Sequence, residues 1–219
     1  DLVAHKGESL VIVGEAQPPA VHAMAHAINA HLGNLGRTVV FTAPPEEKPA
    51  LHMQDIKQLA QDLQNNAVEV LIMLGGVNPA YNAPIDLKFK DLIPKVPLSI
   101  HHGMYVDETA VLCVWHLPES HPFEAWGDAR AFDGTASIQQ PLIFPLYPNT
   151  RSALELMAQL NGAPAETFKL VQEHWKAANL APAAQFDAVW RKGVHDGVLP
   201  RTAKPVKQVA LKQTPLVVQ

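Results

Sequence analysis

The stretch most indicative of the fold is Val70-Leu71-Ile72-Met73-Leu74-Gly75-Gly76-Val77-Asn78-Pro79. Its first five residues are all apolar, which is typical of a strand in a parallel sheet with both faces covered. The glycines, Asn78 and Pro79 that follow are typical of a turn. In open parallel sheets, ligands bind beyond the carboxyl ends of the strands, where glycines let backbone amides approach phosphate. The turn is therefore either part of a ligand-binding crevice or a simple chain reversal.

Outside this stretch, short apolar runs alternate with helical patterns. Runs typical of strands occupy residues 9–14, 38–41, 98–100 and 111–114. Apolar residues at helical spacing from Val21 to Leu32 and from Ile56 to Leu63 predict amphipathic helices between the first three strands. Strand-helix-strand order predicts a parallel sheet with right-handed crossovers, an α/β fold of the Rossmann-like kind. The run that ends at Gly14 lacks the G-x-G-x-x-G fingerprint of dinucleotide binding.

The last third of the chain has a different character. Residues 118–148 are rich in proline and predict a long irregular stretch that is functional or packs against another domain. Ser152 and Glu155 form the pattern of a capping box, and two more helical patterns follow at 168–175 and 186–194. After Pro200 the chain carries bases and no acid. We therefore expect an α/β domain at 1–162, a helical extension at 163–200 and a basic extended tail at 201–219.

The composition excludes several classes of protein. The chain has 219 residues, 47% of them hydrophobic and 17% charged, as in an ordinary globular protein. A net charge of −4 argues against a nucleic-acid partner. A single cysteine, Cys113, cannot form an internal disulfide or an iron–sulfur ligand set. The apolar runs are far shorter than the ~20 residues of a membrane helix. Because the chain starts at Asp1 with neither methionine nor a signal peptide, we expect a piece of a longer protein.

The eleven histidines raise the possibility of a metal site. His22 and His26 lie four residues apart on one face of a predicted helix, but zinc needs three or four protein ligands. His101 and His102 follow the predicted strand at 98–100, and His116 and His121 border the proline-rich stretch. Because no H-E-x-x-H pattern occurs, packed or solvated histidines are the expectation, and no metal ligand is assigned.

Three motifs, in order, resemble those of molybdopterin oxidoreductases. These are AINAHLGNLG at 27–36, the G-x-N-P loop within LGGVNPAYNAP at 74–84, and Glu108-Thr109-Ala110 followed by Leu117-Pro118 and Glu124. The stretch HLPESHPFEAWGDARAFDGTASIQQPLI at 116–143 is most similar to one branch, the iron–sulfur subunit of alternative complex III, a quinol-oxidising respiratory complex. The resemblance implies a pterin-dinucleotide crevice lined by Gly75, Gly76, Asn78, Pro79 and Thr109.

The sequence also departs from the family pattern. Val77 is an extra residue in the G-x-N-P loop, and Val114 stands where the family has an aspartate. Asp133 to Ser137 replace the Asn-x-Glu-Gly-Arg run that reaches the cofactor in active members, so the arginine that could bind phosphate is missing. No molybdenum ligand is identifiable. The resemblance together with these departures implies a vestigial crevice without cofactor.

The leading hypothesis is therefore a non-catalytic scaffold in a respiratory complex. The resemblance implies that the parent protein carries iron–sulfur clusters elsewhere, associates with other subunits and lies on the periplasmic or exoplasmic side of the membrane. One alternative is the cofactor-binding domain of an active bis-pterin molybdenum enzyme, so whether the parent chain is an enzyme stays open. Another alternative is a periplasmic ligand-binding domain, which rests only on the open sheet.

The sequence also predicts three structural features. The loop at Gly75 to Pro79 should face His101 and His102 in a loop after Ile100, and together they should outline the crevice. Lys88 and Lys90, the nearest cations in the sequence, should lie on a short helix from Asp86 to Ile93 and point to solvent. Trp115 and Trp126, with the prolines around them, should form an exposed apolar patch that another part of the parent protein covers.

Overall fold

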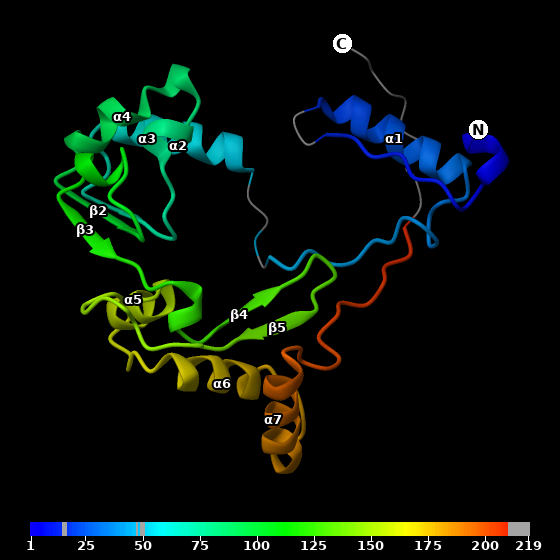
Figure 1. Ribbon diagram of the computed structural model, residues 1–219. Coiled ribbons are helices and arrows are strands. Elements are labelled where there is room, and N and C mark those ends of the chain that lie inside the picture. Colours follow the sequence, from blue (N-terminus) through cyan, green and yellow to red (C-terminus); the bar gives the residue numbers. More distant parts are fainter. Residues whose placement is uncertain (15–16, 47, 49–50, 210–219) are drawn as a thin grey trace. The chain divides into compact units, whose positions relative to one another are not determined.

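The structure is a computed structural model that describes residues 1–14, 17–46, 48 and 51–209 (Figure 1). The chain forms two compact units. Of the described residues, those within 1–45, 132–134 and 203–209 form one unit, and those within 46–131 and 135–202 form the other. These units do not coincide with the sequence-based ranges 1–162, 163–200 and 201–219, which remain predictions about domains.

The larger unit contains a three-stranded parallel sheet in the order β1-β2-β3. Strands β1 (Val70–Met73), β2 (Leu98–Gly103) and β3 (Trp115–Pro118) pair with Ile72 opposite Ile100 and Ile100 opposite Trp115. Helix α2 (His52–Gln64) precedes β1, whereas the short helices α3 (Pro79–Asn82), η2 (Ile85–Leu87), α4 (Phe89–Leu92) and η3 (Ile93–Lys95) connect β1 to β2. Helix η4 (Ala110–Leu112) connects β2 to β3. The predicted α/β class is confirmed.

Apolar side chains of α2, β1, α4 and η3 form the core of this sheet. The buried residues are Ala60, Leu63, Leu71, Met73, Phe89, Leu92, Ile93 and Val96. Ala60 and Leu63 belong to the apolar stripe that predicted α2, so the 3.6-residue period turns this face of the helix towards β1. Each fully buried large side chain contributes roughly 1.5–3 kcal/mol. This burial fixes the position of β1 and of the turn that follows it.

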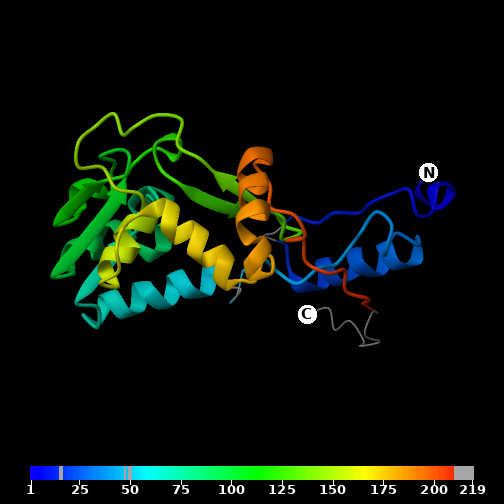
Figure 2. The same ribbon diagram turned by 90° about the horizontal axis from the view of Figure 1, so that it is seen from below.

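A hairpin and the C-terminal helices form a second core in the same unit. Strands β4 (Gly127–Arg130) and β5 (Ala136–Gln139) pair antiparallel, after the short helix η5 (Pro122–Glu124). Helices α5 (Ala153–Leu160), α6 (Thr167–Ala177), η6 (Ala183–Gln185) and α7 (Phe186–Asp196) follow (Figure 2). Directly after α7 the chain bonds to β5, where Ile138 N donates to Gly197 O at 3.0 Å. The core residues are Ala136, Ile138, Val171, Trp175, Phe186, Trp190 and Leu199.

The prediction of an irregular stretch from 118 to 148 is wrong where β4 and β5 form. Strand β4 pairs with β5, and Ala136 and Ile138 pack against α6 and α7. A regular hairpin therefore forms although prolines are frequent nearby. The capping box is confirmed, since the Ser152 side chain accepts from Glu155 N and the Glu155 carboxylate accepts from Ser152 N. The two helical patterns after it correspond to α6 and α7.

The smaller unit contains η1 (Leu2–His5) and α1 (Pro19–His31). Helix α1 is confirmed, but the predicted strands at 9–14 and 38–41 are wrong, because these residues form only the isolated bridge Leu35–Val39. The Asn29 side chain accepts from Val11 N at 3.0 Å and donates to Val11 O at 2.8 Å. In residues 9–14, the backbone of Val11 therefore bonds to a side-chain amide and not to a neighbouring strand. The Ile12 side chain is 78% exposed.

Two further elements differ from expectation. Residues 110–112 form η4, and β3 begins only at Trp115, because the Asp107 carboxylate accepts from Thr109 N and Ala110 N and starts a helical turn. The predicted helix from Asp86 to Ile93 is divided at Lys88, which adopts a left-handed conformation with φ 48°. Lys88 and Lys90 are exposed, as expected.

Within the described part of the chain, no helix has the length and apolar character to span a membrane.

Candidate functional site

The candidate site lies at the carboxyl end of the parallel sheet. Strand β1 leads into the turn Gly75–Asn78, β2 ends with His101, His102 and Gly103, and His116 lies on β3. His101 pairs in register with Met73 on one side and His116 on the other. The two histidines expected in a loop after Ile100 are thus strand residues, since β2 continues to Gly103. The sheet therefore fixes their backbone positions.

The glycines allow a tight turn against β2. Gly75 and Gly76 have φ values of 74° and 65°, a region that residues with a Cβ rarely adopt. Gly76 N donates to His102 O at 3.0 Å. A Cβ on Gly103 would lie 2.8 Å from His101 Cε1 and 3.0 Å from Gly76 Cα. Gly103 must therefore be glycine for the His101 ring to lie beside the turn.

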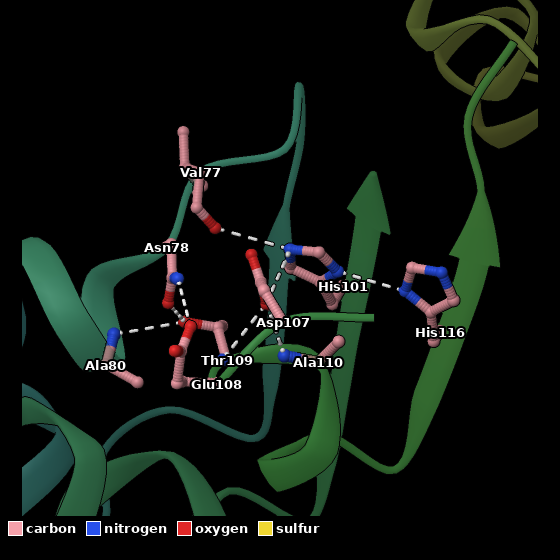
Figure 3. A network of polar contacts seen from close by, with 9 residues as sticks. All are labelled: Val77, Asn78, Ala80, His101, Asp107, Glu108, Thr109, Ala110 and His116. Atoms are coloured by element: carbon pink, nitrogen blue, oxygen red, sulfur yellow. Dashed lines mark hydrogen bonds and ion pairs between the residues drawn. The ribbon is translucent and has the colours of Figure 1, made fainter. Parts of the chain in front are cut away.

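His101 connects the turn to β3 (Figure 3). The side chain is fully buried; its Nε2 lies 3.3 Å from Val77 O and 3.7 Å from Asp107 Oδ1. Because Val77 O can only accept, His101 Nε2 carries the proton and donates. His101 Nδ1, 3.0 Å from His116 Nδ1, then accepts from His116. The pKa of His116 lies below its ordinary value because burial disfavours the charged ring and His101 opposes it.

Asn78, Glu108 and Thr109 form the second half of the network (Figure 3). Thr109 Oγ1 donates to Asn78 Oδ1 at 2.7 Å and accepts from Ala80 N at 3.0 Å. Asn78 Nδ2 donates to Glu108 Oε2 at 2.7 Å, and this hydrogen bond lowers the pKa of the Glu108 carboxyl. Thr109 is fully buried. Its hydrogen bond to Asn78 brings these two predicted residues into direct contact. Pro79 begins α3 directly after them.

This arrangement does not fit the phosphates of a pterin dinucleotide. The polar groups of Asn78 and Thr109 bond to one another, and Asp107 and Glu108 place two carboxylates beside the turn. A dinucleotide needs several donors or cations aligned on its phosphates. The hydrogen bonds of this network involve neither lysine nor arginine. The site can hold its own turn in place, and the contact between His101 and His116 ties it to β3.

His102 takes part in a separate contact that sequence reasoning missed. Its Nε2 lies 2.8 Å from Arg151 O, and its buried Nδ1 has no hydrogen bond and lies 3.9 Å from Glu119 Oε1. Residue 151 reaches the end of β3 through a parallel bridge with Glu119. The capping box at Ser152 predicted where a helix starts, but no sequence signal showed that the chain returns to β3 there.

The other predicted residues lie apart from the network. His26 contacts Phe41 in the smaller unit, with ring centroids 5.7 Å apart. Throughout the residues that the structure describes, no group of three or more histidine, cysteine or acidic side chains is placed to hold a metal ion. Trp115 is 59% exposed, whereas Trp126 is partly buried and packs edge-to-face on Phe168. The two tryptophans therefore have different surroundings.

Comparison with known proteins gives one informative similarity. No family model matches the chain. The chain is 25% identical over 178 residues to the menaquinone reductase, molybdopterin-binding-like subunit of Nitratidesulfovibrio vulgaris Hildenborough, covering 74% of this chain and 26% of that protein. The chain thus spans about a quarter of that relative's length. The similarity supports a molybdopterin-oxidoreductase-like assignment and a respiratory oxidoreductase-like subunit; it does not support alternative complex III in particular.

Proposed function

We propose that the chain is the molybdopterin-binding-like part of a subunit in a quinone-linked respiratory complex, and that it serves there as a scaffold without molybdenum cofactor. The relative described above is named as a subunit of a quinone reductase and as molybdopterin-binding-like. The sequence motifs around Gly75 and Thr109 favour the same class of protein. Both observations support a place in an assembly.

The scaffold role rests on one observation, the closed network at the carboxyl edge of the sheet. In a site that binds phosphate, the turn and the strand ends present free donors to the ligand. Here His101 donates towards Val77 O, Thr109 donates to Asn78, and Asn78 donates to Glu108. These donors hold the turn to the sheet, and the carboxylates beside it repel phosphate. The carboxyl edge of the sheet is therefore held rigid by its own hydrogen bonds.

The finer parts of the proposal come from the sequence resemblance. We assign the complex to the quinol-oxidising type represented by alternative complex III, on the periplasmic or exoplasmic face of the membrane. Iron–sulfur clusters would be bound by other parts of the parent protein, because Cys113 is the only cysteine in this chain. In this proposal the chain positions neighbouring subunits for electron transfer.

One observation favours the alternative, a cofactor-binding domain of an active molybdenum enzyme. Gly75 and Gly76 keep the left-handed conformation of a phosphate-binding turn, and a Cβ on either would meet nothing within 4 Å. Calorimetric titration of the full-length protein with guanosine diphosphate separates the two proposals. Saturable binding at Gly75 and Gly76 supports the alternative, and absence of binding supports the scaffold.

The proposal is tested by tagging the protein in its natural host and purifying the complex. We expect quinone-linked oxidoreductase activity to co-purify with the chain. Asn78→Ala should lower the amount of assembled complex while turnover per assembled complex stays unchanged. A complex that assembles fully but loses turnover contradicts the scaffold role, and purification without any quinone-linked activity contradicts the assignment to such a complex.

A further inference from the structure

The segment after β5 exposes an unusual series of large apolar side chains. Residues 140–149, named here the apolar loop, connect β5 to the region of α5. Leu142, Phe144, Leu146 and Tyr147 are 73%, 92%, 71% and 72% exposed. Ile143 and the neighbouring Phe123 are also exposed. Single exposed apolar residues are ordinary, but a contiguous group marks an interaction surface.

The apolar loop is held in a defined conformation. Leu142 N and Ile143 N donate to Phe123 O at 2.8 and 3.2 Å, and Leu146 N donates to Glu124 Oε1 at 2.9 Å. Thr150 Oγ1 donates to Tyr147 O at 3.1 Å. Pro141, Pro145 and Pro148 restrict the backbone further. Such a preorganised surface loses little conformational entropy when it binds a partner.

The charges around the apolar loop favour a protein over a lipid surface. Residues 136–150 contain no charged side chain. The loop is bordered by the carboxylates of Glu119 and Glu124 and by one base, Arg151, whose guanidinium donates to Thr150 O. Segments that lie on membranes carry several lysines or arginines that contact anionic lipid headgroups. A loop with more carboxylates than bases lacks that attraction.

We propose that this chain is part of a longer polypeptide, and that the apolar loop and Phe123 dock against an apolar surface formed by the remainder of that polypeptide. This inference rests on the proposed function, because the relative that supports it is a protein of which this chain covers only 26%. Permanent contacts are more apolar than transient ones, and an uncharged loop with two exposed aromatic rings, Phe144 and Tyr147, fits a permanent contact. Phe144 is the central anchor.

Thiol labelling of the full-length natural subunit, purified away from its partners, tests the inference. A Phe144→Cys variant is treated with a maleimide in native buffer and in urea, and labelling of its peptide is measured by mass spectrometry. We expect labelling at least about 10-fold slower in native buffer than in urea. The control, Lys169→Cys on the exposed face of α6, should show little protection. Equal native labelling at both positions overturns the inference.

Other outcomes assign a different occupant and also overturn it. Protection that appears only after partner subunits are added assigns the surface to another chain, and protection lost on dilution assigns it to a second copy. Protection that requires phospholipid vesicles assigns it to the membrane. If Phe144→Cys does not fold, a photo-crosslinking amino acid at Tyr147 replaces it, and crosslinks within the same polypeptide are expected. Because none of these measurements involves quinone turnover, they can fail independently of the proposed function.

Discussion

His101 Nδ1 lies 3.0 Å from His116 Nδ1, and the two rings stack with centroids 5.2 Å apart and an interplanar angle of 19°. The two atoms share one proton, so His116 donates when His101 donates to Val77 O. If both Nδ1 atoms carried protons, the hydrogen bond would be lost, because neither nitrogen could accept. The pair therefore links β3, through His101, to the turn after β1.

Acidification should destabilise the protein through His116. Its pKa in the folded chain lies below the ordinary value of about 6.5, because of burial first and His101 second. As pH falls below about 6.5 the unfolded chain takes up the proton first, so the free energy of unfolding decreases. Urea unfolding should show that the free energy of unfolding decreases less between pH 7.5 and pH 5.5 in His116→Gln than in the natural protein. His52→Gln, on the exposed start of α2, is the control, and an NMR titration of His116 at or above 6.5 would contradict the expectation.

Removing the Thr109 hydroxyl should weaken the network. Thr109→Val keeps the shape of the side chain but leaves Ala80 N and Asn78 Oδ1 without this partner. Leaving buried polar groups unpaired costs about 1–3 kcal/mol, and chemical denaturation measures it. Thr167→Val is a matched control, because Thr167 begins α6 and its side chain does not cap the helix. Equal stability of the two variants would show that the network contributes nothing.

Adding a methyl group at Gly103 should displace His101. The new Cβ would meet His101 Cε1 at 2.8 Å and the backbone of Gly76 at 3.0 Å, so the strand or the turn must move. Overpacking of this kind typically costs about 1–3 kcal/mol. Gly14→Ala is the control, since its Cβ meets nothing within 4 Å. Gly103→Ala should also change the NMR signals of the His101 ring, and unchanged signals with full stability would refute this packing.

The second core should depend on the indole N–H of Trp175. The nitrogen donates to Asp128 Oδ2 at 2.7 Å, and Arg130 lies over the ring at 4.8 Å from its centroid. Trp175→Phe loses the hydrogen bond and should reduce the free energy of unfolding by about 1–3 kcal/mol, because the acceptor is charged. Trp115→Phe changes an exposed ring and should have a much smaller effect. The reverse ranking would mean that α6 is not anchored to β4 in this way.

The sequence predicted elements whose partners lie nearby along the chain. Strand β1, helix α2 and the capping box of α5 were predicted correctly, because local periodicity and local hydrogen bonds determine them. Residues 9–14 have the same strand-like composition but pair with Asn29. A strand needs a neighbouring backbone as well as suitable side chains, and local residue types do not reveal whether that neighbour is present.

The candidate site was predicted in part. The glycine turn, Asn78 and Thr109 came from motif resemblance, and the structure brings Asn78 and Thr109 into contact. The link from His101 to His116 depends on the register of β2 and β3, which cannot be read from residue types. Arg151 reaches β3 through a bridge that only the folded chain shows.

Elemental and pterin analysis of the native full-length protein shows whether it is a molybdopterin-like scaffold without its cofactor. The protein is purified from its natural host under conditions that retain metal ions, and molybdenum, iron and released pterin nucleotide are quantified per polypeptide. We expect iron without stoichiometric molybdenum or pterin nucleotide. Molybdenum and guanine dinucleotide at one or more equivalents per polypeptide would contradict it.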